Sequence, residues 1–214
     1  MSSDLFEFME NTDTDEYCLN FIGASLSGSD LDLVTELRHE IDGSVERWII
    51  RCLSVREHII ELGYCGHDLQ VFSDHVLLWP HVMPTASLYF HGIAADPAAV
   101  VGALYASHIK LAGRWVPFDR WFNQLSSLMS LTGAAYGLLA EGPEPLITSY
   151  AQVMERFGFE TSVLSRPAIH WDGARFVEST GPLVALVSEP TYVIAAEIRS
   201  ERVRQAREAE VPAT

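Results

Sequence analysis

Apolar side chains in residues 47–62 recur at the spacing of one helix face. The residues at this spacing are Trp48, Cys52, Val55, Ile59 and Leu62. Intervals of three and four residues place side chains on one side of a helix, and the Gly63 that follows is a typical helix end. We therefore predict a helix over 47–62. A shorter helix is predicted from Ser29 or Asp30, both good N-cap residues, to Ile41.

The pattern then changes to the two-residue period of strands. It covers the runs 69–72, 75–79 and 86–93, which Pro80 and Pro84 separate. A period of two places one face of a strand against a core, and proline interrupts regular structure. We expect three short strands joined as a meander.

Helical signals return in the middle of the chain. Asp96 followed by Pro97 is a strong helix start, because the acid caps the first turn and proline lacks only an N–H that would have no partner there. We expect this helix to end at Gly113. The uncharged run 125–140 and the segment 146–157 are predicted to form two further helices.

The last third is predicted to return to strands. The turn-forming pairs Asp172-Gly173 and Glu189-Pro190 separate its apolar runs. The predicted strands cover 159–164, 168–171, 175–177, 183–187 and 192–198. A charged terminal helix is expected at 200–210.

These predictions give an α+β fold, because strands that come in groups favour antiparallel sheets over a doubly wound parallel sheet. We expect antiparallel sheet(s) in two strand groups, about 69–93 and 159–198, with a central helical segment and N- and C-terminal helices. The expected domains are a loosely ordered acidic arm at 1–28, a single α+β domain at 29–210 and a frayed tail at 211–214. A diverged duplication is an alternative organisation of that domain.

Charge divides the chain unevenly. The formal net charge is −15, and residues 1–46 contain twelve acids against one base, Arg38. Negative charge repels the phosphates of nucleic acids and of anionic membranes, so binding to nucleic acid is unexpected and we predict no membrane association. One interpretation of the acidic segment is a solubilising terminus. The other is an arm that docks on a basic partner or covers a basic groove.

Composition favours a cytoplasmic protein. A hydrophobic share of 48% with 20% charged residues is typical of a globular core. We see no signal-peptide pattern, and the apolar run 125–140 is shorter than the roughly 18–20 residues that a bilayer requires. Three cysteines without tight spacing do not suit a disulfide framework, so we expect a reducing compartment. Thirteen arginines against one lysine suggest a GC-rich bacterial genome.

Motifs that would reveal an enzyme or a metal protein are weak here. The sequence has no phosphate loop, dinucleotide fingerprint, zinc-protease motif or nucleophile elbow. The densest group of zinc-ligand types comprises Cys65, His67, His75 and His81. Its spacing matches no zinc module, and the calcium-like run 11–15 leads to Ile22 where a bidentate Glu is required. We predict no metal and no cofactor.

Basic and aromatic residues concentrate in 108–123, which we call the basic-aromatic corner. The candidate binding residues of the corner, with His91 from the end of a predicted strand, are His91, His108, Lys110, Arg114, Trp115, Asp119, Arg120 and Trp121. Tryptophan supplies rigid contact area and arginine a bidentate fork, and both types are enriched at binding hot spots. The alternative is structural, with the tryptophans as core anchors and Asp119 paired to a neighbouring arginine.

Three functional hypotheses follow. The first is a non-enzymatic cytosolic binding or regulatory protein that recognises a protein or a small ligand through the corner, with a homodimer as one form of it. The second is an enzyme of unrecognised family with a pocket near His91, His108, Arg114 and Asp119. The third is an acidic immunity or anti-defence protein that neutralises a basic partner.

Overall fold

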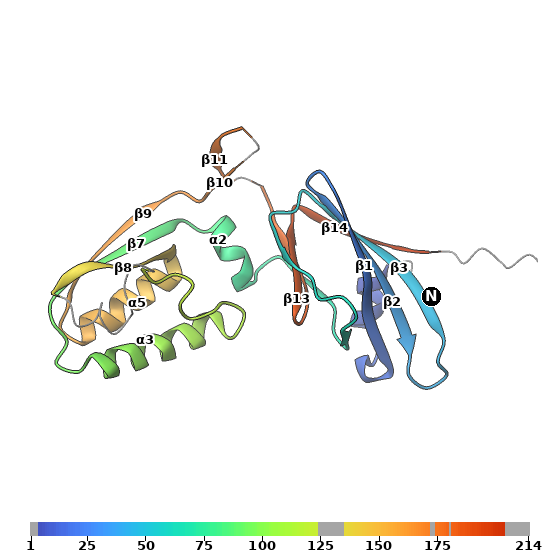
Figure 1. The fold of residues 1–214 in the computed structure, drawn as a ribbon, viewed down its shortest axis with the longest axis horizontal. Coiled ribbons are helices and arrows are strands. Elements are labelled where there is room, and N and C mark those ends of the chain that lie inside the picture. Colours follow the sequence, from blue (N-terminus) through green and yellow to red (C-terminus); the bar gives the residue numbers. More distant parts are fainter. Residues whose placement is uncertain (1–3, 124–134, 172–173, 180, 204–214) are drawn as a thin grey trace, which may run out of the picture. The chain divides into compact units, whose positions relative to one another are not determined.

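The computed structural model describes residues 4–123, 135–171, 174–179 and 181–203. It has an α+β fold with antiparallel sheets of five, four, three and two strands (Figure 1). The expected single domain at 29–210 is divided here into two compact units. Unit 1 comprises Met1–Ser73 and Pro182–Thr214, and unit 2 is the uninterrupted segment Asp74–Gly181.

Unit 1 is built almost entirely from strands. Its elements are α1 (Leu5–Glu10), the 3₁₀ helix η1 (Thr14–Glu16), β1 (Tyr17–Ser27), β2 (Asp30–His39), β3 (Val45–Leu53), β4 (Glu57–Ile59), β5 (Cys65–Gly66), β6 (Gln70–Phe72), β12 (Val184–Ser188), β13 (Thr191–Ala195) and β14 (Glu197–Arg202). One sheet has the order β14-β3-β2-β1-β5 and the other β4-β13-β12-β6. Phe72 at the end of β6 lies directly opposite Ala185 of β12.

The two sheets of unit 1 share one hydrophobic core. Leu33 and Ile50 from the five-stranded sheet and Leu186 and Val193 from the four-stranded sheet belong to the same buried cluster. Helix α1 adds Leu5, which is fully buried. Because the cluster joins strands from both ends of the chain, unit 1 can form only when residues beyond 182 return to it.

The helices predicted at 29–41 and 47–62 are wrong, since these segments form β2 and β3. In β2 every second residue from Leu31 to Leu37 is buried. In β3 the residues Trp48, Ile50 and Cys52 face the core, while Ile49 lies half-buried on the opposite face. Ile49 is apolar although it lies on the face away from the core. Its cross-strand neighbours on β2 and β14 shield it from solvent.

The segment 1–28, expected as a loosely ordered arm, holds α1, η1 and β1. The apolar residues of the segment explain why it is folded, because Leu5, Leu19 and Phe21 are buried in the core of unit 1. Strand β1 pairs with β2 over its length and with β5 on the other side. The acids of this segment therefore lie at α1, on η1 and in the turn between them, and β1 itself carries none.

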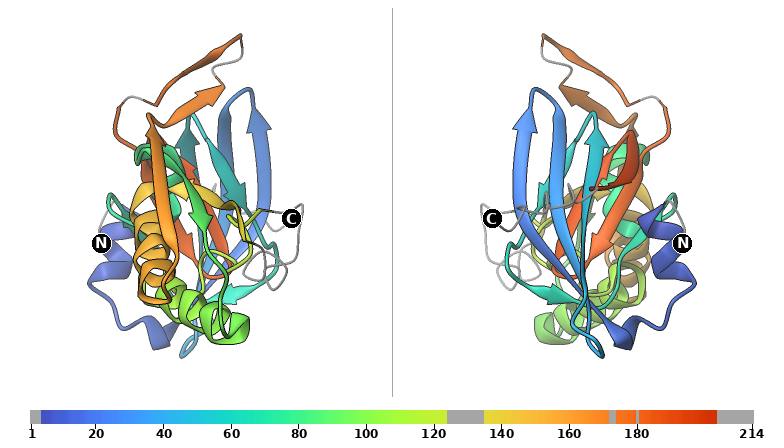
Figure 2. Two further views of the ribbon diagram at one scale, coloured as in Figure 1. Left: turned by 90° about the vertical axis from the view of Figure 1, so that its left-hand side faces the viewer. Right: turned by 90° about the vertical axis from the view of Figure 1, so that its right-hand side faces the viewer.

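Unit 2 places helices on one face of a three-stranded sheet. Its elements are η2 (Val76–Leu78), α2 (Trp79–Val82), β7 (Thr85–His91), α3 (Pro97–Ala112), β8 (Tyr136–Pro143), α5 (Glu144–Arg156), β9 (Glu160–Arg166), β10 (Ile169–Trp171) and β11 (Phe176–Glu178). The strand order is β8-β7-β9, and β10 and β11 form a separate hairpin. Helix α5 packs against the three strands, and α3 packs against α5 (Figures 1 and 2).

The predictions for unit 2 are confirmed where the signals are local. Helix α3 begins at Pro97 after its Asp96 cap and ends before Gly113, which has a φ of 57°. Helix α5 and strands β7 and β9 also lie where they were expected. The strand predicted at 75–79 is wrong, because η2 and α2 occupy it.

Two predicted helices are only partly covered by the described residues. The helix at 125–140 is wrong at its end, where β8 begins at Tyr136, and 125–134 lies outside the described residues. The terminal helix at 200–210 is wrong at its start, because Ser200–Arg202 pairs with β3 as part of β14. Residues 204–210 lie outside the description. The two units differ in architecture, which gives no support to a duplication.

Candidate functional site

His108 is a structural residue of the helix layer in unit 2. Its side chain is fully buried, with Nε2 2.7 Å from the carbonyl oxygen of Val116 and Nδ1 2.7 Å from the hydroxyl of Tyr150. A carbonyl oxygen can only accept, so Nε2 donates, and the Tyr150 hydroxyl can then donate to Nδ1. Burial raises the pKa of the Tyr150 phenol well above its usual range, which keeps this donor protonated.

His91 lies on the face of the sheet that α3 and α5 do not cover. In β7 the buried residues Leu88 and Phe90 face the helices, so His91 points to the opposite side. Its Nδ1 is 3.5 Å from Oε2 of Glu160, and both side chains are largely exposed. The strand alternation therefore separates His91 from the buried His108.

Trp115 lines an open pocket with residues from outside the corner. The cavity measures about 350 Å³ and is lined by Asp74, His75, Val76, Trp79, Leu111, Ala112, Gly113 and Trp115. The imidazole of His75 meets the indole of Trp115 edge to face, with ring centroids 5.2 Å apart. Both indoles of this lining are partly exposed. We call this cavity the aromatic pocket.

Local structure fixes His75 at the rim of the aromatic pocket. Its Nδ1 accepts a hydrogen bond of 3.3 Å from the backbone N–H of Leu77 and so caps η2. This role requires Nδ1 to be unprotonated. Burial lowers the pKa of His75, and the neighbouring Asp74 carboxylate acts in the opposite direction with a smaller effect. The neutral ring is therefore the favoured form near neutral pH.

Lys110 belongs to a second opening, a groove of about 870 Å³ between α3 and α5. Small side chains form much of its lining, and the hydroxyls of Ser107 and Ser149 lie 2.5 Å apart across the two helices. Glu155 and Arg156 line the same groove. This opening is larger than the aromatic pocket, but its lining is small and charged and offers no rigid apolar contact.

Arg120 and Trp121 lie at the outer edge of β8. The guanidinium of Arg120 is 4.9 Å from the centroid of the Trp121 ring, a cation–π arrangement. The backbone of Trp121 accepts from Glu141 N–H, and an added Cβ at Gly142 would lie 2.9 Å from the Trp121 ring. Arg114 and Asp119 are exposed on the same connector. The corner thus divides into the buried His108, the aromatic pocket, the helix groove and the β8 edge.

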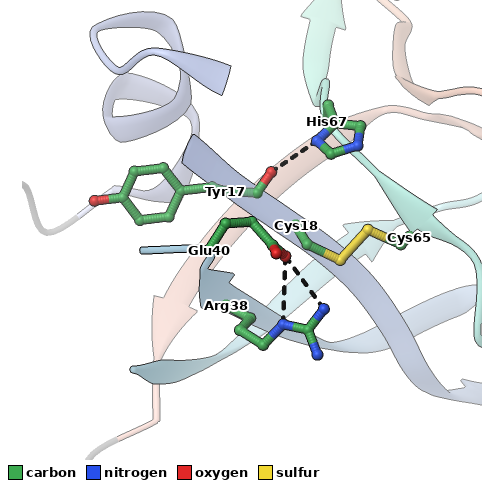
Figure 3. The surroundings of a disulfide bond; sticks show 6 residues. All are labelled: Tyr17, Cys18, Arg38, Glu40, Cys65 and His67. Atoms are coloured by element: carbon green, nitrogen blue, oxygen red, sulfur yellow. Dashed lines mark hydrogen bonds and ion pairs between the residues drawn. A yellow bond between two sulfur atoms is a disulfide. The ribbon is translucent and has the colours of Figure 1, made fainter. Parts of the chain in front are cut away.

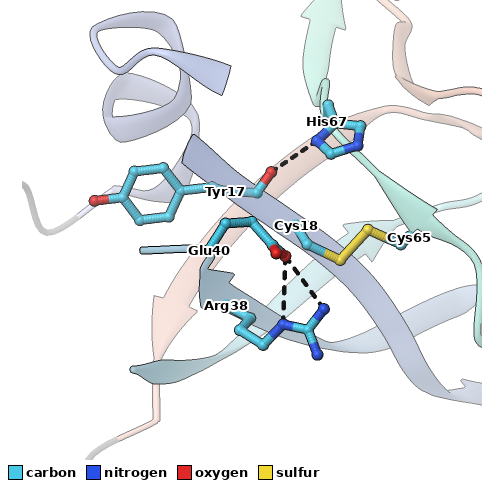
Figure 4. A network of polar contacts seen from close by, with 6 residues as sticks. All are labelled: Tyr17, Cys18, Arg38, Glu40, Cys65 and His67. Atoms are coloured by element: carbon cyan, nitrogen blue, oxygen red, sulfur yellow. Dashed lines mark hydrogen bonds and ion pairs between the residues drawn. A yellow bond between two sulfur atoms is a disulfide. The ribbon is translucent and has the colours of Figure 1, made fainter. Parts of the chain in front are cut away.

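The zinc-type group predicted from sequence does not come together. Cys65 is bonded to Cys18 of β1, with Cα atoms 5.5 Å apart (Figure 3). Nδ1 of His67 lies 3.0 Å from the carbonyl oxygen of Tyr17, and the same view shows the Arg38–Glu40 ion pair (Figure 4). His75 and His81 belong to unit 2. Among the described residues, no three His, Cys, Asp or Glu side chains form a cluster suited to a metal ion.

The Cys18–Cys65 disulfide corrects the expectation of unpaired cysteines. The two residues are 47 positions apart, and only the pairing of β1 with β5 brings them together. Cys52 stays buried and free, and burial raises its pKa to about 12. Because disulfides persist mainly in oxidising compartments, this bond does not support the expected reducing compartment, and cytoplasmic localisation stays a prediction.

Sequence reasoning missed His75 and Trp79 as partners of Trp115. The two-residue pattern predicts a strand over His75–Trp79. In a strand these two side chains would share a face, but nothing in the pattern would bring them to Trp115. The available signal was Pro80, which occupies a first-turn position of α2 and is typical there. The proximity to Trp115 is tertiary and has no sequence signal.

No family model, curated protein or solved structure matches this chain. In the described part of the chain, no helix is long and apolar enough to cross a membrane.

Proposed function

We propose that this chain is a non-enzymatic binding or regulatory protein, and that its aromatic pocket receives a planar group of a small ligand or of a protein partner. The observation that carries the proposal is the convergence of His75, Trp79 and Trp115 on one opening. Its volume of about 350 Å³ falls within the range of about 300–1,000 Å³ that is usual for ligand pockets.

The chemistry of the lining supports an aromatic occupant. Trp79 and Trp115 supply broad apolar faces at low cost in side-chain entropy, and a neutral His75 adds a third ring. Asp74 at the same opening favours an occupant that is neutral or carries a hydrogen-bond donor, and disfavours a carboxylate. Among the small ligands and protein groups considered for the corner, this lining favours an aromatic one.

The first test measures binding of indole, a simple planar probe, by saturation-transfer NMR. Trp115→Ala should weaken indole binding by about tenfold, because it removes the ring that His75 contacts. Trp171→Ala is the matched control, since Trp171 is an exposed indole of the same unit on β10. Equal binding to both variants, or equal loss in both, would contradict the proposal. Near-UV circular dichroism verifies that each variant is folded.

Two observations argue against the two other hypotheses, an enzyme and an acidic protein that neutralises a basic partner. An enzyme using His91 and His108 would need both side chains at one pocket, whereas one is on the uncovered sheet face and the other is fully buried. An acidic decoy would need its carboxylates turned to a partner. In unit 1, however, Glu36 pairs with Arg47 at 2.8 Å and Glu46 pairs with Arg202 at 2.6 Å.

A further inference from the structure

We propose that two copies of this chain pair through β9, antiparallel and centred on Val163, so that two three-stranded sheets join into one of six strands. The inference rests on the edge strand alone and is independent of the aromatic pocket. It commits to one partner, a second copy of the same chain.

The two edges of the β8-β7-β9 sheet differ in how they are covered. At the β8 edge, Ala140 forms a bridge with Phe122, and the N–H of Asn123 donates to Leu139 at 2.9 Å. At the other edge, β7 is the only described strand that pairs with β9. An edge strand with unpaired N–H and C=O groups is a template for another strand.

The central part of β9, from Thr161 to Ser165, has none of the features that protect an edge strand. The strand runs for seven residues, Glu160–Arg166, and contains neither proline nor lysine. Its register with β7 is continuous, without a bulge. Its middle residues Val163 and Leu164 are 37% and 60% exposed. Proline, lysine and bulges are the usual protections of an edge strand, so a long regular edge with apolar residues at its centre is typical of a strand that is paired.

The sequence of β9 is complementary to itself in one register. When two antiparallel copies are centred on Val163, this residue meets its own copy, Thr161 meets Ser165, and Glu160 meets Arg166 at both ends. Moving the centre by one residue leaves positions at both ends unpaired and separates the opposite charges. Cross-strand pairs of opposite charge stabilise a sheet and like charges destabilise it, so the strand selects this register.

The opposite charges lie on the same face of the sheet. Glu160 is opposite His91 and Arg166 is opposite Thr85 in the β7 register, and these β7 positions alternate with the buried Leu88 and Phe90. All of them therefore point away from α3 and α5. Within one copy, Arg166 contacts Glu141 of β8 at 2.8 Å and Glu160 contacts His91 of β7 at 3.5 Å, so each exposed charge must turn from the sheet to the edge when two copies pair.

The small size of the contact limits its strength. One seven-residue strand pair, with its flanking side chains, falls below the roughly 1,200 Å² of a standard stable interface. We therefore expect a dimer with a dissociation constant on the order of micromolar, which dissociates on dilution.

The proposal is tested by two charge-reversal variants of the full chain. Sedimentation velocity, between low and high micromolar concentration, measures how strongly each variant dimerises. Glu160→Arg places two arginines opposite each other at both ends, and Arg166→Glu places two glutamates there. Each variant alone should dimerise about tenfold more weakly than the unaltered chain. An equimolar mixture of the two should recover the original affinity, because every end of the mixed dimer pairs an arginine with a glutamate.

The mixture also controls for folding, since only folded chains can restore the complex. Glu178→Arg, an exposed charge reversal on β11 of the same unit, should leave the dimer unchanged. A chain that stays monomeric over the whole concentration range overturns the proposal. So does a dimer that neither single variant weakens, or a mixture of the two variants that stays monomeric.

Discussion

The interiors of the two units treat buried polar groups differently. In unit 2, His108 and Tyr150 are both fully buried and hydrogen-bond to each other at 2.7 Å. In unit 1, the hydroxyl of Thr35 and the indole N–H of Trp48 are buried without a hydrogen-bond partner among the described residues. The two lie directly opposite each other on β2 and β3. A directional bond therefore joins the two helices at this point in the core of unit 2, whereas shape and strand pairing alone hold Thr35 and Trp48 in the core of unit 1.

The largest effect is expected from breaking the polar pair of unit 2. His108→Leu leaves the Tyr150 hydroxyl and the Val116 carbonyl without partners in the core. Stranded buried polar groups are costly, so we expect unfolding to become easier by about 3 kcal/mol, measured by urea denaturation. Adding Tyr150→Phe should then cost less than it does in the unaltered chain. Additive losses from the two substitutions would show that the pair is not coupled.

In unit 1, removing a buried polar group is expected to raise stability instead of lowering it. Thr35→Val replaces a hydroxyl that has no partner in the described structure by a methyl group of similar size, so stability should rise by about 1 kcal/mol. Thr191 is the matched control, because it is equally buried and its hydroxyl accepts from the N–H of Glu61 at 3.0 Å. Thr191→Val should lower stability by about 1 kcal/mol. Denaturation curves in which both substitutions have the same sign would remove the distinction.

The smallest effect is expected from acid, through His75 of unit 2. Its pKa is lowered in the folded state by burial, so the unfolded chain binds the proton more readily. Stability is then fully present above the unfolded pKa of about 6.5 and is lost as pH falls through that value toward the folded pKa. His75→Phe keeps an aromatic ring and removes the titration. Between pH 7.5 and pH 5.5, the free energy of unfolding should fall more for the unaltered chain than for His75→Phe. An equal fall in both proteins would contradict this prediction.

Fold prediction from the sequence succeeded where one local signal decides the structure. The pair Asp96-Pro97 favours the first turn of a helix over other local structures, and α3 begins there. It failed at β3 because an interval of four residues fits two periods. Trp48 and Cys52 share a face in a helix and also in a strand, and the choice between them depended on β2 and β14. Those partners lie up to 154 positions away, between Trp48 and Arg202.

The candidate site was less predictable than the fold. The residue types of the corner were informative, since Trp115 lines the aromatic pocket and Lys110 the helix groove. Their grouping was not, because His91 is separated from the corner by strand alternation and His108 is used for packing. The other half of the pocket comes from His75 and Trp79, about 40 residues earlier in the chain. Only tertiary packing brings such groups together.

The pairing of β6 with β12 has a consequence for how this chain can vary. Phe72 and Ala185 face each other across two neighbouring strands, so the polypeptide leaves unit 1 and re-enters it at adjacent points. A short hairpin turn could span the same points. The whole of Asp74–Gly181 is therefore, in topological terms, one expanded loop. Such a loop can lengthen, shorten or be exchanged during evolution while the two sheets of unit 1 are retained.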